Sequence, residues 1–81
     1  MSDMSDIFEK VKTFLDDAGL DGESANLESH LENDLCAEVV DILLVCEDLE
    51  DHYDIDIPHG DFASWDTVQD VVNTVHRLLS N

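Results

Sequence analysis

The sequence has 81 residues, enough for one small domain with a single apolar core, and its hydrophobic fraction of 43% is ordinary for a folded protein. Three basic residues face 21 acidic ones, which gives a formal net charge of −18. A field of this sign repels phosphate backbones and anionic lipids, so nucleic acid and membrane partners are disfavoured and a basic protein surface is favoured.

The sequence also bears on compartment and assembly. No apolar run is long enough to span a bilayer, and the first residues, MSDMSDIFEK, lack the basic and apolar regions of a signal peptide. Cys36 and Cys46 are too few for a disulfide framework and should stay reduced. We therefore expect a cytoplasmic monomer with one domain over residues 1–81.

The first predicted element is an amphipathic helix. Ser5 is a good N-cap, Asp6 suits the positive end of the helix dipole, and Gly19 is a typical stop. Between them, apolar residues recur at helical spacing: Ile7, Phe8, Val11, Phe14, Leu15 and Ala18. From Leu20 to about Leu35 the composition indicates a long loop, which Leu27, Leu31 and Leu35 would anchor to the core.

A second helix is predicted from about Ala37 to Tyr53. A first set of apolar residues falls on one face of this helix, and a second set makes that apolar face wider. We therefore expect this helix to be more deeply enclosed than the first. The first set is Val39, Ile42, Leu43, Cys46, Leu49 and Tyr53, and the second is Val40, Leu44 and Val45.

Two further helices complete the predicted fold. A brief helical turn is expected around Gly60 to Ser64, after Pro58 has forced an extended link. The last helix should begin at Asp66 or Thr67, because Thr67 and Asp70 have the spacing of a capping box and a valine-rich stripe follows them. We therefore predict an all-α fold, a small antiparallel helical bundle with three main helices and one short helix.

Two segments carry a family resemblance. LLVCEDLEDHYDIDIP and the closing WDTVQDVVNTV resemble the second helix and the start of the last helix in the acyl carrier protein family. Immediately before the second helix, Asp34-Leu35-Cys36-Ala37 resembles the family's Asp-Leu-Gly-Ala, with Cys36 in place of the glycine. The resemblance covers nearly the whole chain and implies the fold of a carrier protein.

The resemblance fails at the attachment point. In the family, the second helix opens with Asp-Ser-Leu, and the serine hydroxyl receives the phosphopantetheine arm. Counting back from Pro58 without gaps places Glu38, Val39 and Val40 at these three positions. A valine has no nucleophilic oxygen, so no phosphopantetheine cofactor is expected and Val39 merely occupies the expected serine position.

The resemblance leaves a binding function in place. Acidic side chains of the second helix, which meet basic patches on enzymes in the family, are the predicted partner-binding residues: Glu38, Asp41, Glu47, Asp48, Glu50 and Asp51. The leading hypothesis is an acidic carrier-like protein that docks through this helix onto a basic surface of a lipid or polyketide biosynthetic enzyme.

Two alternatives stay open. The chain could carry an acyl group by a non-standard attachment at Cys36, or hold one non-covalently in its core. It could also be a small acidic inhibitor or immunity-type protein. No metal site is predicted, since the histidines and cysteines lack zinc-ligand spacing and no EF-hand loop is present. Nothing resembles a catalytic motif, so no enzymatic activity is expected.

Overall fold

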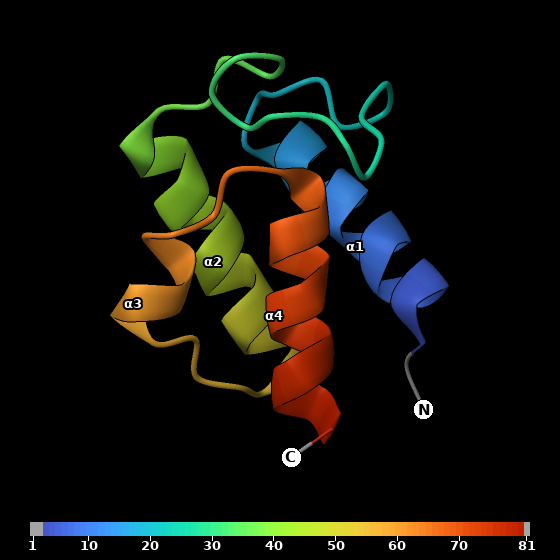
Figure 1. Cartoon of the computed structure of the whole chain (residues 1–81), viewed down its shortest axis with the longest axis vertical. Helices are drawn as coiled ribbons and strands as arrows, with labels where there is room; N and C mark the ends of the chain where they lie inside the picture. The colour runs from blue at the N-terminus through green and yellow to red at the C-terminus, as the bar shows by residue number, and fades with distance from the viewer. Residues whose placement is uncertain (1–2, 81) are drawn as a thin grey trace.

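The computed structural model describes residues 3–80 and contains four helices, three long and one short. They are α1 (Met4–Asp17), α2 (Val39–Tyr53), α3 (His59–Phe62) and α4 (Val68–Ser80). Helix α1 packs against both α2 and α4 and runs in the opposite direction to them (Figure 1). The predicted all-α bundle is confirmed.

Helix α1 begins two residues earlier than its predicted cap implies. Asp3 is the N-cap, and its carboxylate accepts a hydrogen bond from the backbone N–H of Asp6 at 2.9 Å. Ser5, predicted as the cap, lies inside the helix, because the aspartate two residues earlier is an equally good cap. The predicted stop is confirmed, since the helix ends at Asp17 and Gly19 adopts a left-handed φ of 89°.

The long loop between α1 and α2 is held at both ends. At its start, the backbone N–H groups of Gly22 and Glu23 donate to the carboxylate of Asp16, and a Cβ on Gly22 would lie 2.1 Å from the Lys12 carbonyl oxygen. Further on, the loop pairs with the start of α4, where Val68 N–H donates to the Ser29 carbonyl at 3.0 Å. These bonds make it an ordered part of the fold, as predicted.

The predicted burial of α2 is wrong over its first half. Val45, Cys46 and Leu49 are buried, but Val39, Val40 and Leu44 are 70%, 59% and 50% exposed, and Leu43 is 37% exposed. Spacing explains the outcome. Val45 and Leu49 are one turn apart and face the core, and a helix that packs on one side leaves the apolar residues of its other side in solvent.

The N-terminus of α4 has the predicted capping box. Asp70 N–H donates to Thr67 Oγ1 at 3.3 Å, and Asp70 Oδ2 accepts from the N–H groups of Thr67 at 3.0 Å and Asp66 at 2.8 Å. These backbone donors, Asp66 first, hold the pKa of the Asp70 carboxyl below its ordinary value.

Asp70→Ala should therefore lower the free energy of unfolding by about 1 kcal/mol at pH 7. Because the folded-state pKa is depressed, the contribution of Asp70 is present above the unfolded-state pKa and is lost as the pH falls through the folded-state pKa. In urea unfolding, the loss of free energy of unfolding caused by Asp70→Ala should be smaller near pH 3 than at pH 7. An equal cost at both values would contradict the role given to the carboxylate.

Candidate docking site on the second helix

Val39 is the first residue of α2 and projects into solvent. Glu38 is the N-cap, and its backbone N–H donates to the carboxylate of Asp41 at 3.0 Å. The preceding backbone is unusual, because Cys36 has a left-handed φ of 57°. Val39 therefore lies at the N-terminus of α2, and its apolar side chain is 70% exposed to solvent.

The first two turns of α2 carry a concentration of exposed apolar side chains. Val39, Val40, Leu43 and Leu44, called the apolar ridge below, are four of the five exposed large hydrophobic residues within residues 3–80; the fifth is Met4 on α1. A small soluble domain gains nothing in stability from leucine and valine in water. The ridge is therefore an exposed apolar patch, a feature that often marks binding surfaces in proteins.

The six predicted partner-binding residues do not share one face. Three are exposed, namely Glu38, Glu47 and Asp51, and the other three are half-buried: Asp41, Asp48 and Glu50. Asp41 accepts the Glu38 N–H, and Glu50 accepts the backbone N–H of Ile57 at 2.8 Å. Asp41 and Glu50 therefore take part in holding the chain at the two ends of α2.

The exposed acidic residues continue the line of the apolar ridge. Val40, Leu44, Glu47 and Asp51 follow one another at intervals of three or four residues, so their side chains share one side of the helix. The exposed face of α2 is thus apolar over its first two turns and acidic beyond them.

A groove opens beside the start of α2 and is lined by residues of α2, of α3 and of the segments next to them. Its volume is about 240 Å³. The residues that line it are Glu32, Val39, Ile42, His59, Phe62, Ala63 and Trp65. The groove could not be predicted from the sequence, because no pattern in it tells how closely the four-residue helix α3 approaches α2.

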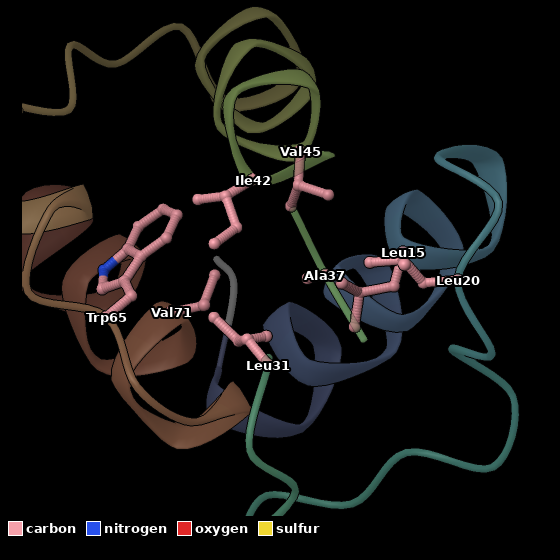
Figure 2. Close-up of a pocket in the computed structure, with 8 residues that line it drawn as sticks. All are labelled: Leu15, Leu20, Leu31, Ala37, Ile42, Val45, Trp65 and Val71. Atoms are coloured by element: carbon pink, nitrogen blue, oxygen red, sulfur yellow. The ribbon is translucent and has the colours of Figure 1, made fainter. Parts of the chain in front are cut away.

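The interior beneath the groove is nearly filled. Eight apolar side chains from α1, α2, α4 and the connecting segments converge there, leaving about 10 Å³ of empty space (Figure 2). They are Leu15, Leu20, Leu31, Ala37, Ile42, Val45, Trp65 and Val71. That volume is about the size of one water probe, so this cavity is too small for an acyl chain in this conformation.

The two cysteines have different surroundings. Cys46 is 3% exposed, as expected of a small buried hydrophobe, and burial, reinforced by Glu50 and Glu47, raises the pKa of its thiol to about 11. Cys36 is exposed at the end of the loop before α2. Neither cysteine forms a disulfide.

Two further findings concern ions and membranes. Within residues 3–80, no group of three or more His, Cys, Asp or Glu side chains is arranged to hold a metal ion. Over the same residues, no helix has both the length and the apolar character needed to cross a membrane.

Comparison with known proteins identifies the family. No profile of a known protein family matches the sequence. The acyl carrier protein of Clostridium acetobutylicum, however, is 36% identical to this chain over 70 residues, which cover 85% of this chain and 91% of the clostridial protein. Together with the helical bundle, this similarity shows that the chain belongs to the acyl carrier protein family, whose members are carriers and not enzymes.

Proposed function

We propose that this protein binds a biosynthetic enzyme of lipid or polyketide synthesis through α2 and does so without a phosphopantetheine arm. The observation that carries the proposal is the first residue of α2. Val39 stands there with 70% of its side chain exposed, where the family resemblance expects a serine, and a valine offers no oxygen for a phosphodiester bond.

The backbone before α2 supports this alignment. Aligned without gaps, Cys36 takes the place of a family glycine, and Cys36 has a φ of 57°. Glycine reaches this left-handed region freely, whereas residues with a Cβ are disfavoured there by about 1 to 2 kcal/mol. A turn shaped for glycine at position 36 is consistent with the register that places Val39 at the attachment position.

The nearest serines on either side of α2 do not replace the missing hydroxyl. Ser29 lies in the long loop, and its Oγ accepts the backbone N–H of Asn26 at 3.0 Å. Ser64 follows α3, and its hydroxyl donates to the Asp61 carbonyl at 2.8 Å. Neither lies on α2, and both hydroxyls take part in local hydrogen bonds.

Charge supports the class of partner. Glu38, Glu47 and Asp51 are exposed along α2 in a chain of net charge −18. Such a field accelerates association with a basic surface and opposes association with another acidic protein, and charges of this kind act mainly on the association rate and on partner choice.

A competition assay tests the proposal. The family resemblance implies that the second helix meets basic patches on enzymes, so we expect this protein to slow the modification of a standard acyl carrier protein by a phosphopantetheinyl transferase while remaining unmodified itself. Glu47→Lys with Asp51→Lys should reduce that inhibition by about tenfold or more at low salt, because both charges are exposed and lie one turn apart. Intact mass of the standard carrier over time is the readout.

Reversals outside α2 provide the control. Asp17→Lys with Glu23→Lys changes the net charge by the same amount at two exposed positions, one at the end of α1 and one in the loop. This variant should inhibit nearly as well as the natural protein. If the two double variants lose inhibition equally, net charge alone acts and α2 is not the docking element.

A further inference from the structure

We propose that a recess between α1 and the end of α2 binds a zwitterionic small molecule of the α-amino acid class, with its carboxylate at Lys10 and its ammonium at Asp6. The recess has a volume of about 360 Å³, within the range of about 300 to 1,000 Å³ typical of small-molecule sites. This inference does not depend on the proposed function, because the recess lies at the far end of α2 from Val39. Six residues line it: Asp6, Glu9, Lys10 and Thr13 of α1, and His52 and Tyr53 of α2.

Aromatic contacts hold the two sides of the recess together. The ring centroid of His52 lies 4.7 Å from that of Tyr53 and 5.8 Å from that of Phe14 on α1, both in edge-to-face geometry. Burial and, second, the carboxylate of Asp6 raise the pKa of the Tyr53 hydroxyl. Tyr53 of α2 and Asp6 of α1 therefore lie within electrostatic reach of each other, and the hydroxyl stays a hydrogen-bond donor at neutral pH.

Two opposite charges of the recess have no ion-pair partner. Asp6 and Lys10 lie one turn apart on α1, a spacing that commonly gives an ion pair, but within residues 3–80 neither side chain forms one. The other two basic side chains of the chain do form ion pairs, and Lys12 does so with Glu9 at 3.9 Å. The carboxylate of Asp6 and the ammonium of Lys10 are therefore both available to a ligand in the recess.

Charge decides the class of ligand. An anion is opposed by the net charge of −18, and a cation is attracted to carboxylates over the whole surface but repelled by Lys10 in the recess. A zwitterion has no net charge for this field to repel, and a carboxylate beside an ammonium can bind both of its ends. An α-amino acid has this chemistry, and the rings of His52 and Tyr53 offer an apolar side chain a surface to pack on.

Three compounds with the same side chain test the inference. Free leucine carries both charges, N-acetyl-leucine lacks the ammonium, and leucinamide lacks the carboxylate and is mostly a cation at about pH 7. Each is titrated into the ¹⁵N-labelled protein at physiological salt, which screens the general attraction of cations to the acidic surface. We expect leucine to shift the amide signals of Lys10, Thr13 and Tyr53, and to bind at least about tenfold more tightly than either derivative.

Variants of the protein assign each charge of the ligand to its residue. Lys10→Met should weaken leucine binding by about tenfold without weakening leucinamide, and Asp6→Asn should weaken leucine without weakening N-acetyl-leucine. Lys12→Met and Asp17→Asn are the matched controls, because they make the same charge changes on the same helix at residues that do not line the recess. Both controls should bind leucine as the natural protein does, and circular dichroism should show all four variants folded.

Three outcomes would overturn the inference. If leucinamide binds as tightly as leucine, the acidic surface attracts cations and the recess selects no zwitterion. If leucine shifts none of the amide signals of the recess at millimolar concentration, the recess binds no amino acid of this kind. If Lys12→Met weakens leucine binding as much as Lys10→Met, net charge acts instead of the recess.

Discussion

Leu49→Ala is expected to remove about 3 kcal/mol from the free energy of unfolding, a large part of the stability of so small a domain. Leu49 is 0% exposed and lies on the side of α2 that faces the core beside Val45. Truncating it leaves a cavity among side chains that cannot close around it, so the loss of burial and the cavity act together. Urea unfolding monitored by Trp65 fluorescence or circular dichroism measures the change.

Leu44→Ala is the matched control, because it removes the same atoms from the same helix. Leu44 is 50% exposed, so its truncation should change the free energy of unfolding by less than about 0.5 kcal/mol. Equal costs at the two positions would mean that the start of α2 is buried, and the apolar ridge would then be an element of the core instead of a binding surface.

Converting the opening of α2 to the family sequence is expected to create an acceptor for phosphopantetheine. The triple variant Glu38→Asp, Val39→Ser, Val40→Leu places a hydroxyl on the first residue of the helix, where the side chain is 70% exposed. All three positions are exposed, and aspartate is one of the preferred N-cap residues, so the fold should tolerate the change. With excess transferase and coenzyme A, the natural protein should remain unmodified and the triple variant should be modified completely.

The single variant Val39→Ser separates the hydroxyl from its surroundings. If the single variant accepts the arm, the hydroxyl alone was missing. If only the triple variant accepts it, the transferase also reads the flanking residues. A folded triple variant that remains unmodified would show that the docking surface of α2 has diverged from the family, and it would weaken the proposal that this helix still binds family enzymes.

The sequence predicted the buried faces of α1 and α4 better than the buried face of α2. In α1 and α4, apolar residues alternate with polar ones at helical spacing, so the buried stripes could be identified: Ile7, Val11 and Leu15 in one, Val68, Val71, Val72 and Val75 in the other. In α2, the run from Val39 to Val45 is apolar on every side except at Asp41. Because apolar and polar residues do not alternate in this run, the sequence does not indicate which side of the helix is buried. Only the packing of α2 against α1 shows it.

The candidate site was therefore predicted in part. Family resemblance pointed to α2 and to Val39, and Glu38, Glu47 and Asp51 are exposed as a docking role requires. It did not predict that Glu50 would accept the Ile57 N–H at 2.8 Å, since a bond between residues in different elements depends on how the chain turns after Tyr53. The groove likewise depends on the approach of α3 to α2, which is a tertiary property.

The most direct test of this account is the intact mass of the natural protein after incubation with a broad-specificity phosphopantetheinyl transferase and coenzyme A. A standard acyl carrier protein in the same tube confirms that the transferase is active. The standard carrier should gain the arm while this chain keeps its mass, because Val39 at the opening of α2 offers no hydroxyl. A phosphopantetheine adduct on this chain, at any residue, would contradict it.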